Sequence, residues 1–262
     1  MGLNLLEDKM KKYSILTFNF GNYEIFREPE EIDEDCEYVY VTDNPNLKSN
    51  IWKIIIEDKF KEHSPYYKAF YVRYHPFEYV NTDTCIVLDS SIKIKKKLNN
   101  IIEDFNLRND DIGLLLMPFH DNKPFEEIKV WHSQLKRLST IQANLLYSLY
   151  KHFKMENYRG GIDAGFKIVK NTEKIKEFHN TIWEHILFLK GDSDICRLDQ
   201  VVLSLLLYKM FNSLSVMLFS RKWIQSDYLH YCHHGTNRES FYFNINYNNQ
   251  YFMNKPANFY YV

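Results

Sequence analysis

The chain has 262 residues, of which 45% are hydrophobic, and this is enough to bury the core of one α/β domain. Its 33 basic and 34 acidic residues nearly cancel, so no global basic field favours nucleic acid as a partner. The four cysteines are far apart and lack zinc-ligand spacing, and the charged N-terminus has no apolar segment typical of a signal peptide. No apolar stretch approaches the length of a membrane span. We therefore expect one domain over residues 1–262, with a tail at 240–262, in a cytoplasmic protein with reduced thiols.

Short apolar segments alternate with helical ones along the chain. Strands are predicted at 13–19, 37–42, 52–57, 84–89, 112–117, 161–170 and 213–219, and helices at 64–74, 95–105, 124–151, 172–189 and 198–211. The run 84–89 is almost wholly apolar, which is typical of a strand buried on both faces of a sheet. The alternation predicts an α/β fold with a mostly parallel sheet flanked by helices.

Three strand ends carry polar clusters, and in open α/β sheets ligands bind beyond the carboxyl ends of the strands. Asp43 follows the second strand and could bind a nucleobase or ribose, or form an Asx-turn. Asp89, with Ser91, follows a buried strand and could hold Mn²⁺ or Mg²⁺, or close a turn. Asp163 lies between two glycines, which lets backbone approach a ligand or marks a bulge.

Further candidates lie on helices and loops. Lys68 and Arg73 could contact phosphate, although a solvated basic face explains them equally well. His120 could contact a donor or acceptor sugar, and Asp199 could point into a cleft from the start of an apolar helix. The pair at 233–234, His233 and His234, could supply a late metal ligand or lie at the surface.

No glycine-rich phosphate loop, dinucleotide fingerprint or nucleophile elbow is present. If the chain binds phosphate, it must therefore use a metal ion and basic side chains.

The order of these clusters resembles glycosyltransferases of the GT-A fold. The nearest resemblance is to a glycosyltransferase-like family, formerly a domain of unknown function, of plants and bacterial polysaccharide loci. That family has a Thr-Asp-Asn element, a Tyr-Lys and Pro segment, a strand ending in Asp-Gly-Asn, and an Arg-Asp-Gln helix. The matching residues are Thr42-Asp43-Asn44, Tyr67-Lys68 with His75-Pro76, Asp89-Ser90-Ser91 and Arg197-Leu198-Asp199-Gln200, with His120 and Glu126-Glu127 between them.

A second resemblance is to the family of glycogenin and the lipooligosaccharide galactosyltransferases. There a metal-binding Asp-x-Asp is followed by a sugar-binding glycine strand, an Asp-Gln helix and a late histidine. Asp163-Ala164-Gly165, Asp199-Gln200 and His233 or His234 occur here in that order, while Ser91 replaces the second aspartate of the metal motif.

The resemblance implies a nucleotide-diphosphate sugar as donor and a glycan or glycolipid as acceptor, in surface polysaccharide synthesis such as capsule or lipooligosaccharide. It implies that Asp43 binds the base or ribose and that Lys68 and Arg73 neutralise phosphate. It also implies that Asp163 and Asp199 contact the donor sugar or the acceptor hydroxyl. In an inverting enzyme, one of these two carboxylates would act as general base. Asp89, Ser91 and His233 or His234 would hold Mn²⁺ or Mg²⁺. A non-catalytic nucleotide- or sugar-binding module and a sugar-phosphate nucleotidyltransferase stay as alternatives, and peripheral contact with a membrane stays open.

Overall fold

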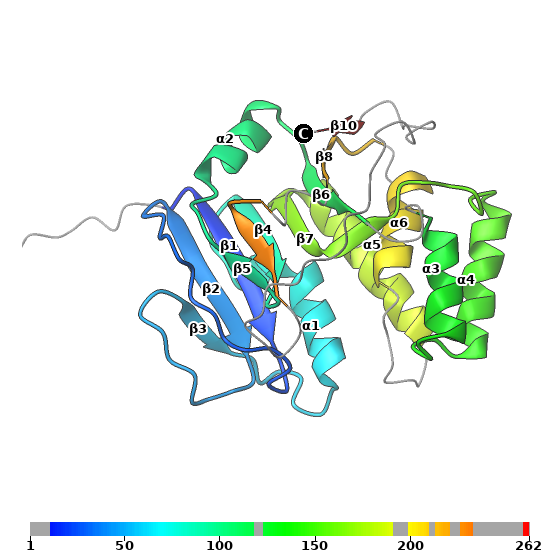
Figure 1. Ribbon diagram of the computed structural model, residues 1–262, viewed down its shortest axis with the longest axis horizontal. Coiled ribbons are helices and arrows are strands. Elements are labelled where there is room, and N and C mark those ends of the chain that lie inside the picture. The colour runs from blue at the N-terminus through cyan, green and yellow to red at the C-terminus, as the bar shows by residue number, and fades with distance from the viewer. Residues whose placement is uncertain are drawn as a thin grey trace, which may run out of the picture.

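The fold was determined as a computed structural model of the whole chain (Figure 1), which describes residues 11–117, 123–190, 199–209, 213–220, 226–232 and 259–261. Strands and helices alternate along most of the sequence, and the strands assemble into one large sheet with the order β10-β8-β6-β7-β4-β1-β2-β3. Its strands are β1 (Tyr13–Asn19), β2 (Cys36–Thr42), β3 (Lys53–Ile56), β4 (Thr84–Asp89), β6 (Ile112–Leu116), β7 (Ile162–Lys170), β8 (Val216–Phe219) and β10 (Phe259–Tyr261).

Most neighbouring strands run parallel. The pairs β1·β2, β1·β4, β2·β3, β6·β8 and β8·β10 are parallel, whereas β7 runs antiparallel to both β4 and β6. The predicted mostly parallel α/β sheet is therefore confirmed. Because β7 is reversed, the residues at its start lie at the same edge of the sheet as the carboxyl ends of β4 and β6.

The two faces of the sheet are covered by different elements, and this explains why its strands are apolar almost throughout. Leu16 and Phe18 of β1 pack in a core with helices α1 (Pro65–Tyr74), α3 (Pro124–Ser133), α4 (Thr140–His152), α5 (Glu173–Lys190) and α6 (Asp199–Lys209). Ile15 of the same strand faces a second core with α2 (Asn99–Leu107) and β5 (Ile92–Ile94). Figure 1 shows α3 to α6 gathered beside one end of the sheet and α2 apart from them.

Helix α1 begins where the sequence predicts. The Ser64 hydroxyl accepts a hydrogen bond from the Tyr67 N–H at 3.3 Å, Pro65 occupies the first turn, and the helix ends at Tyr74, before Pro76. The apolar run within α6, Val201 to Leu207, is buried.

The helical region predicted over 124–151 consists of two helices, α3 and α4, with a turn between them. The chain leaves α3 through Lys136, whose φ of 53° is left-handed and ends a helix. A new helix then begins at a capping box, in which Ser139 and Gln142 exchange side chain to backbone hydrogen bonds. The turn between the helices was missed because the range contains no glycine and no internal proline.

The helix predicted over 95–105 begins later than expected. Residues Ile92–Ile94 form β5, which pairs antiparallel with β9 (Leu229–Tyr231) in a separate small sheet. The N–H of Lys95 continues this pairing with a 2.8 Å hydrogen bond to the carbonyl of Tyr228. This contact between residues far apart in sequence keeps the segment extended, so α2 starts only at Asn99.

Candidate active site

A cavity of about 540 Å³ lies where the carboxyl ends of β1 and β4 meet the start of β7 and the start of α6. Its wall combines aromatic side chains with five carboxylates and two arginines. The carboxylates are Glu24, Asp89, Glu127, Asp163 and Asp199, the arginines are Arg73 and Arg137, and the aromatic residues are Phe18, Phe20, Tyr23, Tyr66, Phe70, Trp131 and Tyr231. An apolar wall with converging polar groups is typical of a small-molecule site.

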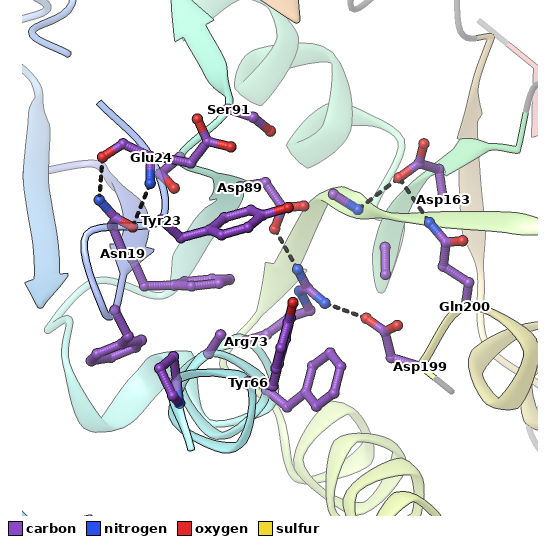
Figure 2. A pocket seen from close by; sticks show the side chains of 18 of the residues that line it. Asn19, Tyr23, Glu24, Tyr66, Arg73, Asp89, Ser91, Asp163, Asp199 and Gln200 are labelled. Atoms are coloured by element: carbon purple, nitrogen blue, oxygen red, sulfur yellow. Dashed lines mark hydrogen bonds and ion pairs between the residues drawn. The ribbon is translucent and has the colours of Figure 1, made fainter. Parts of the chain in front are cut away.

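Arg73 holds two of these carboxylates together. Its guanidinium, on the last turn of α1, forms ion pairs with Asp89 at the end of β4 and with Asp199 at the start of α6 (Figure 2). The side chain is buried and lies over the rings of Phe18 and Phe70, at 5.4 and 5.5 Å. Burial lowers the pKa of Arg73, but the charges of Asp89 and Asp199 outweigh burial and raise it above its ordinary value.

Two hydrogen bonds, one from its own strand and one from helix α6, fix the carboxylate of Asp163 at the start of β7. Its Oδ1 accepts a 2.8 Å hydrogen bond from the N–H of Gly165 and a 3.4 Å hydrogen bond from the side-chain amide of Gln200 on α6. Figure 2 shows this carboxylate at the same cavity as the Arg73 ion pairs.

The missing side chain of Gly165 leaves room for two carboxylates. A Cβ at this position would lie 3.1 Å from Oδ1 of Asp163 and 3.1 Å from Oδ2 of Asp89. The second glycine of the Gly-x-x-x-Gly segment 161–165 therefore lets Asp89 and Asp163 approach at one wall without displacement.

Ser91 lies in the same wall with a buried hydroxyl. Its Oγ has no hydrogen-bond partner within the part of the chain that the structure describes, which is costly for a buried polar atom. Its carbonyl accepts a 2.8 Å hydrogen bond from the N–H of Cys232. His233, the next residue in sequence, His234 and His120 all lie outside the described residues.

Asp43 and Lys68, the other two predicted site residues, are not among the lining residues of the cavity. Asp43 accepts hydrogen bonds from the N–H of Gly21 at 3.0 and 3.2 Å, and the Lys68 ammonium lies 3.5 Å from its Oδ2. Asp43 therefore holds the loop after β1 in place, and Lys68 pairs with Asp43 outside the lining of the cavity. The neighbouring Asn44 forms the Asx-turn that was the alternative interpretation, since its Oδ1 accepts from the N–H of Asn46 at 3.0 Å.

The loop after β1 is a part of the site that the sequence did not identify. Asn19 and Glu24 close it reciprocally, because the Asn19 amide donates to the Glu24 carbonyl at 2.7 Å and accepts from the Glu24 N–H at 3.0 Å. Gly21 adopts a left-handed φ of 65° within it. The sequence feature that could have identified this loop is Asn19, the last residue of β1, with Gly21 two positions later. The segment was not selected because it matches no known phosphate loop.

A buried lysine, Lys167 of β7, lies between the sheet and helices α1 and α5. The Lys167 ammonium is 3.2 Å from Nε2 of His179 and 4.2 Å from the centre of the Tyr74 ring. Burial, and next the charge of Arg73, hold the pKa of Lys167 well below its ordinary value. The pKa of His179 is also well below its ordinary value, through burial and then through Lys167.

Within the described residues, no group of three or more His, Cys, Asp or Glu side chains is arranged as a metal site. The same part of the chain contains no helix long and apolar enough to cross a membrane. Cys36, Cys85 and Cys232 are buried.

No protein-family model matches the chain, and no significant match exists among curated proteins. Among solved structures, the apo form of mouse xyloside xylosyltransferase 1 is similar with a TM-score of 0.42 and 9% identity, over 76% of this chain and 82% of that chain. The galactosyltransferase LgtC, in complex with donor and acceptor sugar analogues, is similar with a TM-score of 0.39 and 13% identity, over 74% of this chain and 70% of that chain. Both are glycosyltransferases, the class that the sequence resembles, and at these identities the likeness concerns the fold alone.

Proposed function

We propose that this protein transfers a sugar from a nucleotide-diphosphate sugar to a glycan or glycolipid acceptor. The observation that carries the proposal is the Asp89–Arg73–Asp199 bridge at the carboxyl edge of the sheet, with Asp163 in the same cavity wall. Such a fixed set of carboxylates can accept hydrogen bonds from several sugar hydroxyls at once. Aromatic rings that also line the cavity can pack on a nucleobase or on the apolar face of a sugar.

In the proposed reaction, the acceptor hydroxyl oxygen forms a bond to the anomeric carbon of the donor. The bond from that carbon to the diphosphate oxygen breaks, and its electron pair leaves with the nucleoside diphosphate. Asp163, whose Oδ1 accepts hydrogen bonds from the N–H of Gly165 and the side-chain amide of Gln200, takes the proton of the attacking hydroxyl. Asp199 and Arg73 position the donor sugar.

Two observations support a divalent cation at this wall. Five carboxylates face two arginines, so a diphosphate would meet net negative charge, and the unpaired Ser91 hydroxyl lies in the cavity wall with Asp89. We propose that Asp89 and Ser91, with His233 or His234, hold Mn²⁺ or Mg²⁺. When bound, the ion would stabilise negative charge on the departing diphosphate. A place in surface polysaccharide synthesis in the cytoplasm belongs to the same proposal, and its support is the resemblance in sequence.

The test compares Asp89→Asn with Asp83→Asn, an exposed aspartate just before the other end of the same strand. Thermal stabilisation by a panel of nucleoside diphosphates and their sugars is measured with and without Mn²⁺, and release of nucleoside diphosphate from the sugars is followed by chromatography. We expect one nucleotide to stabilise wild type and Asp83→Asn in the presence of Mn²⁺, and Asp89→Asn to lose this shift.

Other outcomes identify what is wrong. Stabilisation without Mn²⁺, equal in Asp89→Asn, would remove the metal from the proposal. Binding without any release of nucleoside diphosphate in the presence of acceptor glycans would favour a non-catalytic module, and release of pyrophosphate from a nucleoside triphosphate and a sugar phosphate would favour a nucleotidyltransferase. If no nucleotide stabilises the protein, the proposed function is wrong.

A further inference from the structure

Large apolar side chains are exposed where three helices meet at one end of the helical layer. Ile141 near the start of α4 is 74% exposed, and Phe188 near the end of α5 is 75% exposed. Leu145, Leu187 and Leu135 are also exposed. We call these five residues the α4–α5 patch. Exposed aromatic and aliphatic side chains that gather in one place mark an interaction surface, whereas single ones are ordinary.

Contacts between the helices place these residues at the same end of the layer. The Gln142 side-chain amide, one residue after Ile141, lies 3.5 Å from the carbonyl of Lys190, two residues after Phe188. Ile141 and Leu145 are four residues apart on α4 and therefore lie on one face of that helix. Leu135 belongs to the turn between α3 and α4, directly before the left-handed Lys136.

The turn beside Ile141 is basic. Residues 133–145 contain Lys136 and Arg137 and no acidic residue. On the α5 side, Lys190 has Glu184, Asp192 and Asp194 near it in sequence, so the positive charge belongs to the turn. A basic turn beside exposed apolar side chains complements a surface that is anionic outside and apolar beneath.

The patch is continuous with the mouth of the cavity. Leu135 and Arg137 belong both to the turn beside Ile141 and to the lining of the cavity. A molecule that rests on the patch would therefore lie against the cavity opening. This turn is the segment where α3 and α4 separate, so the break in the helix creates both the cavity wall and the patch.

We propose that the α4–α5 patch binds the surface of an anionic lipid bilayer, with Ile141 and Phe188 entering the interface and Lys136 and Arg137 contacting lipid phosphates. The binding depends only on these side chains. Its use, the presentation of the sugar of a lipid-linked acceptor at the cavity, rests on the proposed function.

The experiment is co-sedimentation of the full chain with vesicles of phosphatidylcholine alone and of an equimolar mixture with phosphatidylglycerol. We expect binding to the mixed vesicles that weakens with salt and falls at least about tenfold in Ile141→Ser/Phe188→Ser. Lys136→Gln should weaken it about fivefold, the effect of one basic residue near an anionic surface. Leu107→Ser, an equally apolar and 83% exposed position at the end of α2, is the matched control and should bind as wild type.

Three results would overturn the proposal. They are no sedimentation with mixed vesicles, sedimentation that Ile141→Ser/Phe188→Ser leaves unchanged, and a dimer in light scattering that this variant dissociates. Thermal unfolding of each variant, with and without the stabilising nucleotide, verifies folding and an intact cavity. Vesicle binding in a protein that no nucleotide stabilises would support the patch while contradicting the proposed function, so the two can fail separately.

Discussion

Replacing Arg73 by methionine removes the one buried cation between two carboxylates. Asp199 is 4% exposed, so its charge would be left in a poorly solvated place beside that of Asp89. Breaking a buried ion pair by deleting one partner costs about 3–5 kcal/mol, because the remaining charge is uncompensated. Methionine keeps the packing of the side chain against Phe18 and Phe70, so this cost is mainly electrostatic.

For a domain of this size, 1 kcal/mol shifts the melting temperature by about 2–4 °C, so Arg73→Met should melt about 6–20 °C below wild type. Adding Asp199→Asn to Arg73→Met removes one of the two carboxylates that the guanidinium had joined, and it should recover part of the loss. Circular dichroism during heating and urea unfolding measures all of these effects.

The reasoning is refuted if Arg73→Met melts within about 2 °C of wild type, which corresponds to less than 1 kcal/mol. It is equally refuted if Asp199→Asn lowers the stability of Arg73→Met further, because the double variant would then lack the recovery that charge removal requires.

Three further predictions concern the same region. Gly165→Ala should weaken nucleotide-dependent stabilisation, because its Cβ would displace the carboxylates of Asp89 and Asp163. Gly113→Ala should lower stability by about 1–3 kcal/mol through contact with core side chains and keep nucleotide binding, and thermal shifts with and without nucleotide separate the two variants. Burial, and next the charge of Arg73, lower the pKa of Lys167 in the folded protein. Below the ordinary value of 10.5 the unfolded chain therefore binds more protons than the folded one, so lowering the pH lowers the free energy of unfolding. Lys167→Met should therefore be more stable than wild type in urea, and the difference in free energy of unfolding should grow as the pH is lowered from 10 to 7. A difference that is absent at every pH would mean that the ammonium is well solvated. Ser91→Ala should leave the nucleotide-free protein as stable or more stable, since it removes an unpaired buried hydroxyl, yet it should weaken the Mn²⁺-dependent shift; calorimetry with and without Mn²⁺ tests both parts.

The strands of the central sheet were predictable because both of its faces are covered. Burial on both sides demands continuous apolar runs, and Ile86 to Leu88 is such a run, ended by the polar Asp89. The carboxyl-edge rule then identified Asp89 as a candidate site residue. It also led to Asp163, although the sequence did not reveal that β7 is reversed and that Asp163 reaches the edge by starting its strand there.

What stayed hidden depends on contacts between distant segments. Lys68 and Arg73 are both basic residues of α1 and look alike in sequence. Lys68 pairs with Asp43, which binds the loop after β1, whereas Arg73 bridges carboxylates of β4 and α6. Which partner each finds is set by the position of α1 against the sheet, and no local pattern encodes it. The pairing of β5 with β9 is hidden for the same reason.

One residue of α1 thereby decides the geometry of two other elements. Arg73 binds Oδ1 of Asp89, and the opposite oxygen, Oδ2, is the one that a Cβ on Gly165 would crowd. The same guanidinium fixes Asp199, from which α6 continues into the core, so the cavity wall and the core share one ion-pair network. Carboxylates held in this way need little rearrangement when a ligand enters, and preorganised charge of this kind is an effective contribution to catalysis. The same network explains why Arg73→Met should lose stability, whereas Ser91→Ala should keep it and weaken only the Mn²⁺-dependent shift.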